Sequence, residues 1–228
     1  MKHGNSIKQR HCIMILIFAV ILLLFVCLIW FFTKGNMNDY DTVAYVNNIP
    51  VSYGEYMLHV DETRGETSAY FYENYHVDES VDFWSEKAVF GGENPLEVLK
   101  ETVLDSVTRM KLEQQLMVEY GIVTAEDITY KSFLKIFKKE NLRRKTIIEQ
   151  GGVVYGPEQY TEIGYYNYLH ESRLQELREA MYEESGSTEI SDKFMDTLIE
   201  ERLEEMLEHV EVSTVSGLYD KIQAFSKD

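Results

Sequence analysis

The sequence predicts a mainly α-helical protein, in which an N-terminal transmembrane helix precedes a helical domain whose two ends are joined by a small β-sheet. Three observations predict this class. Residues 13–32 form an uncharged apolar run. Residues 94–210 carry apolar side chains at the three- and four-residue spacing of amphipathic helices. Short segments rich in β-branched residues lie near residues 45 and 212, at the two ends of the remaining chain.

The apolar run from Ile13 to Phe32 has the length of a membrane-spanning helix, because 20 helical residues rise about 30 Å. Lys2, Lys8 and Arg10 precede it and no acidic residue does, which places the N-terminus in the cytoplasm. We therefore expect residues 1–34 to be a cytoplasmic tip and a single-pass anchor in the cell membrane. Residues 35–228 then form an extracytoplasmic domain.

Two other interpretations of this segment fit less well. A cleaved secretory signal has an apolar core of about 7–15 residues and a cleavage site between small residues. Here the core is longer, and the best site, Thr33-Lys34-Gly35, is poor. A lipoprotein anchor needs a small residue just before its cysteine, but Val26 precedes Cys27. An uncleaved anchor is therefore the favoured interpretation.

The charge of the outer part excludes one class of partner. Residues 35–228 hold 18 of the 22 Lys and Arg residues and all 39 Asp and Glu residues, a formal charge of −21. Such a field repels phosphate backbones, so we expect no nucleic-acid partner. Both cysteines, Cys12 and Cys27, lie in or beside the apolar run, so the outer part has neither a disulfide framework nor a thiolate metal site.

The first predicted element after the anchor is a β-hairpin that leads into a helix. Residues 43–46 and 49–51 have strand composition, and Asn47-Asn48 suits the two-residue turn between them because Asn tolerates positive φ. Ser52-Tyr53-Gly54-Glu55 has the S-x-x-E form of a capping box. We expect a helix from Tyr53 towards residue 62 or beyond.

Gly65 is a possible end of that helix, and the aromatic-rich segment 69–90 after it has no clear assignment. The later helices carry caps or prolines at their starts and breakers at their ends. A strand over residues 210–213 and a short helix to about Phe225 complete the chain. The predicted helices run from Asn94-Pro95 to Gly121, from Thr129 to Gly151-Gly152, from Gly156-Pro157 to Ser185-Gly186-Ser187, and from Ser191 to about Val210.

The order of these features resembles the SurA/PrsA-type extracytoplasmic foldases. The resemblance consists of a membrane signal, the pattern V-A-x-V-N-x-x-x-V-S-x-x-E-Y, long amphipathic helices and a terminal V-x-V segment followed by Tyr219-Asp220-Lys221-Ile222. It covers residues 42–60 well and the helices in outline. In that family the corresponding module is a helical domain that holds unfolded exported polypeptides. The matching residues are Val43, Ala44, Val46, Asn47, Val51, Ser52, Glu55 and Tyr56.

The chain departs from the family pattern in one respect. Members often carry a parvulin prolyl-isomerase domain between the core helices and the final one. Between Asn94 and Val210 this chain offers only helix-like segments, and Gly91-Gly92 is followed directly by the helix that Pro95 begins. We infer from the sequence a chaperone-like module without the isomerase domain.

The chain shows no recognisable catalytic motif. It has no G-x-S-x-G, no glycine-rich phosphate loop and no H-E-x-x-H, so we predict no catalytic residue, metal or cofactor. Its six histidines lack metal-ligand spacing, and His170 fits a half-buried packing residue better than a ligand. The acidic side chains of the last long helix are interpreted as a solvated face: Glu200, Glu201, Glu204, Glu205 and Glu208.

Two surface features have a functional and a structural interpretation. A basic cluster could touch a membrane surface or an anionic wall polymer, although a solvated helix face is favoured. Five aromatic side chains could line a peptide-binding groove, because Tyr combines apolar contact with a polar group; alternatively they fill the core. The basic cluster is Lys135, Lys138, Lys139, Arg143, Arg144 and Lys145, and the aromatic set is Tyr53, Tyr56, Tyr70, Phe71 and Trp84.

These observations favour a membrane-anchored extracytoplasmic chaperone that binds unfolded or exported polypeptides without covalent catalysis. One alternative is an anchored interaction subunit that docks a single dedicated partner. Another is a protein related to the prolyl isomerases.

Overall fold

The computed structural model describes residues 37–80, 82–187 and 191–225. The chain divides into two compact units, residues 1–38 and 39–228, and all elements below belong to the second. The predicted anchor at residues 13–32 lies outside the described residues. Within the described ranges, no helix combines the length and the apolar character needed to cross a membrane.

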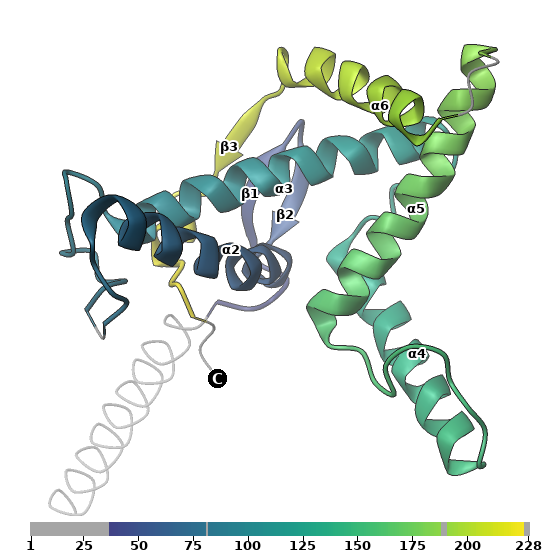
Figure 1. Ribbon diagram of the computed structural model, residues 1–228, viewed down its shortest axis with the longest axis horizontal. Helices are drawn as coiled ribbons and strands as arrows, with labels where there is room; N and C mark the ends of the chain where they lie inside the picture. The colour runs from purple at the N-terminus through teal and green to yellow at the C-terminus, as the bar shows by residue number, and fades with distance from the viewer. Residues whose placement is uncertain (1–36, 81, 188–190, 226–228) are drawn as a thin grey trace, which may run out of the picture. The chain divides into compact units, whose positions relative to one another are not determined.

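A three-stranded antiparallel sheet joins the two ends of the second unit, as the sequence predicts (Figure 1). The strands are β1 (Thr42–Val46), β2 (Ile49–Ser52) and β3 (Val212–Thr214), in the order β2-β1-β3. Tyr45 pairs with Ser213 and with Pro50. Strand β3, about 160 residues further along the chain, therefore completes the sheet that the hairpin begins.

The turn of the hairpin is built from two asparagines in the left-handed region. Asn47 has φ 47° and Asn48 has φ 64°, which is the conformation of a type I′ hairpin turn. The side-chain oxygen of Asn47 accepts a hydrogen bond from the Glu211 amide at 3.0 Å, and the Asn47 amide donates to the Glu211 carbonyl at 2.9 Å. The turn thus also holds the start of β3.

Helix α2 (Tyr53–Tyr75) follows β2 and packs along α3 (Pro95–Glu119). Ser52 caps α2 by accepting a hydrogen bond from the Glu55 amide, and Asn94 caps α3 in the same way. The predicted end at Gly65 is wrong, and α2 continues for ten more residues. It does so because the buried face continues through Thr63, Thr67 and Phe71 at helical spacing.

The segment between α2 and α3 is irregular and covers a cluster of aromatic rings. Phe71 on α2 contacts Phe83 edge-on, with ring centroids 5.6 Å apart, and Phe90 at 6.0 Å. The Asn94 side chain donates to the carbonyls of Ser85 and Ala88, which fixes the path of the segment. These side-chain contacts hold residues 82–94 in place without a helix or a named strand.

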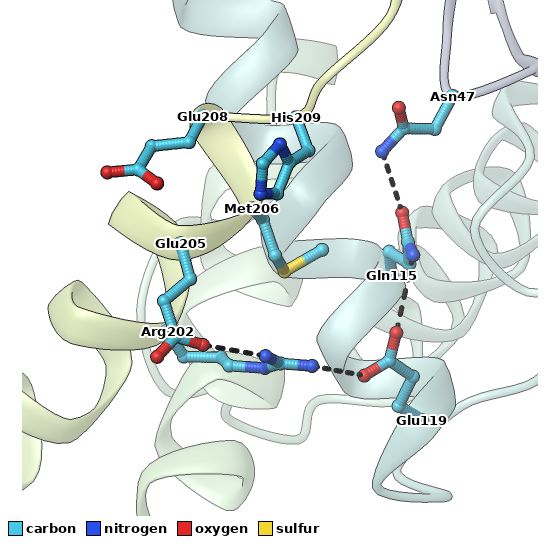
Figure 2. Close-up of a pocket in the computed structure, with 8 residues that line it drawn as sticks. All are labelled: Asn47, Gln115, Glu119, Arg202, Glu205, Met206, Glu208 and His209. Carbon is cyan, nitrogen blue, oxygen red and sulfur yellow. Dashed lines mark hydrogen bonds and ion pairs between the residues drawn. The ribbon is translucent and has the colours of Figure 1, made fainter.

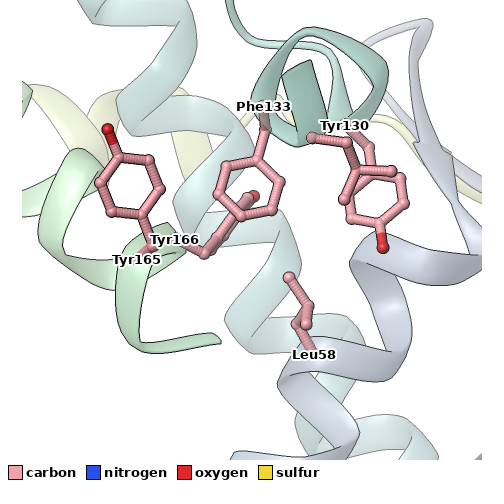
Figure 3. Close-up of a cluster of buried hydrophobic side chains, with 6 residues drawn as sticks. Leu58, Tyr130, Phe133, Tyr165 and Tyr166 are labelled. Atoms are coloured by element: carbon pink, nitrogen blue, oxygen red, sulfur yellow. The ribbon is translucent and has the colours of Figure 1, made fainter. Parts of the chain in front are cut away.

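Helices α4 (Tyr130–Glu149) and α5 (Glu162–Ser185) contribute the larger part of a second cluster. Phe133 lies at its centre, with Tyr166 edge-on at 4.9 Å and Tyr130 stacked at 5.9 Å (Figure 3). Leu58 brings α2 into this cluster. The cluster therefore joins the α4–α5 pair to the α2–α3 pair.

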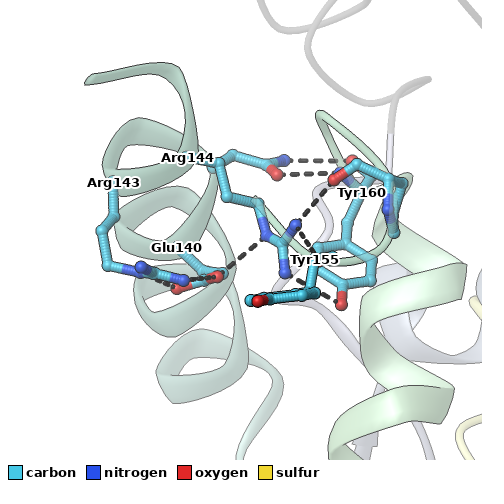
Figure 4. A network of polar contacts seen from close by, with 7 residues as sticks. Glu140, Arg143, Arg144, Tyr155 and Tyr160 are labelled. Carbon is cyan, nitrogen blue, oxygen red and sulfur yellow. Dashed lines mark hydrogen bonds and ion pairs between the residues drawn. The ribbon is translucent and has the colours of Figure 1, made fainter. Parts of the chain in front are cut away.

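Helix α5 begins at Glu162 and not at the predicted Gly156-Pro157. Its cap is Thr161, whose hydroxyl accepts from the Gly164 amide. The preceding loop is held instead by Arg144 of α4, which donates to the carbonyls of Tyr155 at 2.9 Å and Pro157 at 2.7 Å (Figure 4). These contacts hold residues 155–157 against α4, so Pro157 does not start the helix.

Helix α6 (Asp192–Leu207) packs on α5 and α3 through the buried Ile199 and Leu203. Its predicted acidic face is exposed, although Glu200 pairs with Arg109 of α3. Arg109 also pairs with Glu113. After β3, the predicted final helix is a single 3₁₀ turn, η1 (Tyr219–Lys221).

Candidate functional site

The most promising site is an open cavity of about 650 Å³ between β2 and the first turns of α4, called here the hairpin cleft. Its volume lies in the range of roughly 300–1,000 Å³ that is usual for ligand sites. Thr42, Ser52 and Glu55 line it on the side of the sheet and α2. Its apolar lining comes from Tyr40, Ile49, Pro50, Ala125, Ile128 and Tyr130.

Tyr130 forms one wall of the cleft, and a glycine lets it do so. A Cβ atom at Gly54 would overlap the Tyr130 ring, so only glycine lets that ring lie against the first turn of α2 (Figure 3). The Tyr130 hydroxyl donates to the Glu162 carboxylate of α5. Burial, helped by Glu162, raises the pKa of Tyr130 well above its usual value, so the hydroxyl keeps its proton.

Two lysines lie at the edge of the cleft on one face of α4. Lys131 and Lys135 are exposed and four residues apart, so their side chains are neighbours. Neither forms an ion pair with any residue in the described ranges. Glu126 is the exposed acidic residue of the lining. This edge is thus locally cationic on an acidic protein.

A buried ion pair lies at the inner side of the cleft. The Glu55 carboxylate accepts from the Lys111 ammonium at 2.7 Å and from the Tyr166 hydroxyl at 2.6 Å. The side chains of Glu55 and Lys111 are each 2% exposed. The second half of the predicted capping box is therefore not formed, because the carboxylate faces the interior rather than the Ser52 amide.

The polar network extends from this pair between α2, α3 and α5. Lys111 also donates to the Gln114 side chain at 3.1 Å, and Gln114 donates to the Tyr166 hydroxyl at 3.4 Å. Burial, and then the Glu55 charge, raises the pKa of Tyr166 well above its usual value. Tyr166 therefore remains a donor to Glu55.

His59 adjoins this network and is incompletely hydrogen-bonded. Its Nδ1 lies 3.3 Å from the Ser106 hydroxyl, whereas its Nε2 is buried without a hydrogen-bond partner. Burial lowers the pKa of His59 to about 4, with Lys111 lowering it further and Glu55 opposing the shift. His59 is therefore neutral at physiological pH.

His170 is buried on α5, but its partner is polar. Its Nε2 lies 2.7 Å from the Glu113 carboxylate, which also pairs with Arg109 at 3.1 Å. The prediction of a half-buried packing histidine is therefore wrong in degree, because the side chain is buried, and it misses the hydrogen-bond partner Glu113. The sequence contains one signal that Lys111 is buried. Lys111 lies four residues after Val107, which lies four after Val103, so all three are on the apolar face of α3.

The five aromatic residues predicted to bind peptide do not share one surface. Tyr53 and Tyr70 are both on α2 but 17 residues apart, which is about 25 Å along a helix. Tyr56 and Phe71 have no exposed surface, and Trp84 is 8% exposed. For these three the burial supports the alternative interpretation, that the rings fill the core.

The individual contacts of these rings explain their burial. The Tyr56 hydroxyl donates to the Lys100 carbonyl at 2.7 Å, and its ring meets Tyr219 edge-on. Tyr70 is 39% exposed and donates to Glu93 at 2.9 Å. Trp84 donates to Glu79 at 2.7 Å and lines a separate hollow of about 740 Å³ within residues 80–90 and Gln223. Tyr53 is half-buried at the start of α2.

A third cavity, of about 410 Å³, lies between the hairpin turn, α3 and α6 (Figure 2). A chain of contacts runs through it from Asn47 to Gln115, Glu119, Arg202 and Glu205 (Figure 2). Because these side chains bond to one another, we interpret the cavity as a structural connection between the elements.

The predicted basic cluster is divided among three roles. Arg144 is buried and structural, with its guanidinium 4.4 Å from the centre of the Tyr160 ring (Figure 4). Arg143 pairs with Glu140, and Lys145 with Glu149, as expected of a solvated helix face. Lys135 instead lines the hairpin cleft.

No group of three or more His, Cys, Asp or Glu residues in the described part of the chain is placed to hold a metal ion. In comparisons with known proteins, no family model matches the chain, and neither a curated protein nor a solved structure matches it.

Proposed function

We propose that this protein is a membrane-anchored extracytoplasmic chaperone that holds segments of unfolded or exported polypeptide in the hairpin cleft, without covalent catalysis. The observation that carries the proposal is the cleft itself, about 650 Å³ in volume and open, with an apolar lining. In this proposal residues 13–32 are the anchor. The resemblance of residues 43–56 to the SurA/PrsA-type foldases supports the same function.

The chemistry of the lining suits side-chain binding. Strand β2 is an edge of the sheet, but its Pro50 has no amide hydrogen to give an added strand. A bound segment would therefore be held mainly by apolar contact with side chains such as Ile49 and Tyr130. Recognition of this kind tolerates many sequences, which suits a protein that holds unfolded chains.

The walls of the cleft are fixed by the core. Tyr130 is 7% exposed, stacks on Phe133 and is bonded to Glu162. Glu55 is held by the buried pair with Lys111. A preorganised apolar site loses little conformational entropy when it binds, so a small cleft can contribute useful affinity.

The experiment compares two tyrosines of similar exposure. Tyr40 in the cleft is 54% exposed, and Tyr72 on α2, outside the cleft lining, is 56% exposed. Residues 35–228 contain the whole described core and can be tested as a soluble fragment in a light-scattering assay with a chemically unfolded client. We expect Tyr40→Ser combined with Ile49→Ser to reduce suppression of aggregation several-fold, and Tyr72→Ser to leave it unchanged. If the unsubstituted fragment protects none of several clients, the proposal fails.

A second candidate function is that of an anchored interaction subunit for one dedicated partner. It is favoured by the loop after α4, where Val153 is 84% and Tyr155 92% exposed although Arg144 fixes the Tyr155 carbonyl. A loop that is hydrogen-bonded to α4 and exposes apolar side chains is suited to docking. A photo-crosslinker at residue 155 in native membranes would give a single adduct for a dedicated partner and many adducts for a general chaperone.

A further inference from the structure

We infer that the hairpin cleft prefers polypeptide segments in which apolar residues are flanked by acidic ones. This inference rests on the proposed function and defines the class of segment that is bound. It follows from two lysines that line one edge of the cleft on a protein whose net charge is negative. Residues 35–228 carry a formal charge of −21, whereas the cleft is lined by two lysines that form no ion pair with any described residue.

The acidic residues of the cleft do not cancel these lysines. Glu55 is neutralised by Lys111 at 2.7 Å and accepts a further hydrogen bond from Tyr166. Glu126 is then the only acidic lining residue without such a partner in the described part of the chain. Among the described lining residues, Lys131 and Lys135 form no ion pair and Glu126 is the one carboxylate without a cation, so the lining itself carries a small excess of positive charge.

The position of the lysines determines where the acidic residues of a ligand must lie. Lys131 and Lys135 are both exposed and line the cleft from α4, next to the Tyr130 wall. When an apolar side chain of the bound segment lies between Ile49 and Tyr130, the residues next to it in that segment lie near the two lysine ammonium groups. Acidic neighbours would gain attraction there, and basic neighbours would meet repulsion from both lysines.

This preference also bears on how a strongly acidic protein could hold acidic clients. At long range the protein repels negatively charged chains, which reduces the rate of encounter. Within a Debye length of about 8 Å at physiological salt, the two lysines attract the acidic residues of a segment bound beside them. The inference therefore concerns equilibrium affinity in the cleft more than the rate of association.

The test uses three labelled, unstructured peptides with the same apolar centre and acidic, neutral or basic flanks. Their dissociation constants for the full chain in zwitterionic lipid nanodiscs are measured by fluorescence anisotropy at low and high salt. We expect the acidic peptide to bind about five- to tenfold more tightly than the basic one, as two exposed ion pairs allow. The difference should shrink at high salt.

Charge reversal at the cleft should invert this order. Lys131→Glu combined with Lys135→Glu should make the basic peptide the tighter ligand. The matched control is Lys138→Glu combined with Lys139→Glu, which changes the net charge equally at exposed positions of α4 outside the cleft lining. We expect the control to retain the acidic preference.

The outcomes separate this inference from the proposed function. If the three peptides bind with equal affinity, the cleft holds polypeptide without charge preference and the inference is wrong, while the proposed function stands. If the control variant inverts the order as fully as the cleft variant does, the net charge of the protein sets the preference and the inference is again wrong. If none of the peptides binds, the proposed function itself fails.

Discussion

Lys111 of α3 and Glu55 of α2 form an ion pair in the interior of the protein, with 2.7 Å between the ammonium nitrogen and the carboxylate oxygen. Each side chain is 2% exposed, and Tyr166 of α5 completes the environment of the carboxylate. Three helices therefore meet at one buried charge pair, directly behind the proposed binding cleft. The stability of the protein should therefore depend on the two side chains of this pair and on those that adjoin them.

Removing one partner of this pair should be strongly destabilising. Lys111→Met leaves the Glu55 carboxylate buried without its cation, which costs about 3–5 kcal/mol of unfolding free energy. Chemical denaturation of residues 35–228, followed by circular dichroism, measures the change. The exposed pair of Lys145 and Glu149 is the control, and Lys145→Met should change stability by less than about 0.5 kcal/mol. A Lys111→Met loss below about 1 kcal/mol would contradict the burial of the pair.

His59 should make stability fall as the solution is acidified. Burial lowers its pKa from the ordinary 6.5 to about 4, so the unfolded state takes up a proton first as the pH falls. Its contribution to stability is complete above about pH 6.5 and is lost between there and about pH 4, at up to about 1.4 kcal/mol per pH unit.

Replacing His59 separates its effect from that of the other groups that titrate in the same pH range. When the pH falls from 7 to 4.5, the unfolding free energy should decrease in both proteins. The decrease should be about 2–3 kcal/mol smaller in His59→Leu than in the unsubstituted chain. His209 is exposed, and His209→Leu is the matched control variant, measured at the same pH values. Equal acid sensitivity of His59→Leu and the unsubstituted chain would show that His59 is not the group responsible.

Two glycines of α2 should respond in opposite directions to the same substitution. Gly54→Ala forces the Tyr130 ring away from the helix, which should cost about 1–3 kcal/mol and weaken peptide binding at the cleft. Gly65 has no heavy atom of another group within 4 Å of its would-be Cβ, so Gly65→Ala should stabilise the helix by about 0.5–1 kcal/mol. Thermal denaturation checks both values, and destabilisation by both substitutions would contradict this account.

Two adjacent arginines of α4 should contribute differently to stability, because only one of them is buried and bonded to the following loop. Arg144 donates to the Tyr155 and Pro157 carbonyls and stacks on Tyr160, whereas Arg143 is exposed and pairs with Glu140 (Figure 4). Arg144→Lys cannot reproduce the planar set of donors, so we expect a loss of about 2–3 kcal/mol.

Release of the loop gives this prediction a local readout. Hydrogen exchange and limited proteolysis within residues 150–160 should increase markedly in Arg144→Lys. In Arg143→Lys they should stay as they are in the unsubstituted chain. An increase in both variants would mean that loss of the shared Glu140 contact, and not loss of the Arg144 donors to the loop, frees the segment.

Local sequence signals predicted the elements whose geometry depends on near neighbours. Asn47-Asn48 forms the predicted turn because asparagine accepts positive φ, and Asn94-Pro95 begins α3 because the cap and the fixed proline φ both favour a helix start. The pairing near residues 45 and 212 was also predictable, since only the two ends of the outer part had strand composition. The mainly helical class with a small sheet follows from these signals.

Tertiary contacts decided what local signals could not. Gly65 lies in the middle of a helix because the face that includes Thr63 and Thr67 is buried. The start of α5 shifts to Glu162 because Arg144 holds the loop that contains Pro157.

The position of the candidate site was likewise set by contacts between residues distant in the sequence. Glu55 has the spacing of a capping residue, yet it faces inward to Lys111, 56 residues away, because a buried carboxylate needs a cation. The predicted aromatic groove is divided between core and surface, and the cleft is instead formed by β2 and α4. The sequence by itself determined the order of the long helices and of the strands, though not all of their ends. Only tertiary structure decided which charges are buried and where the surface opens, because burial depends on residues far apart in the chain.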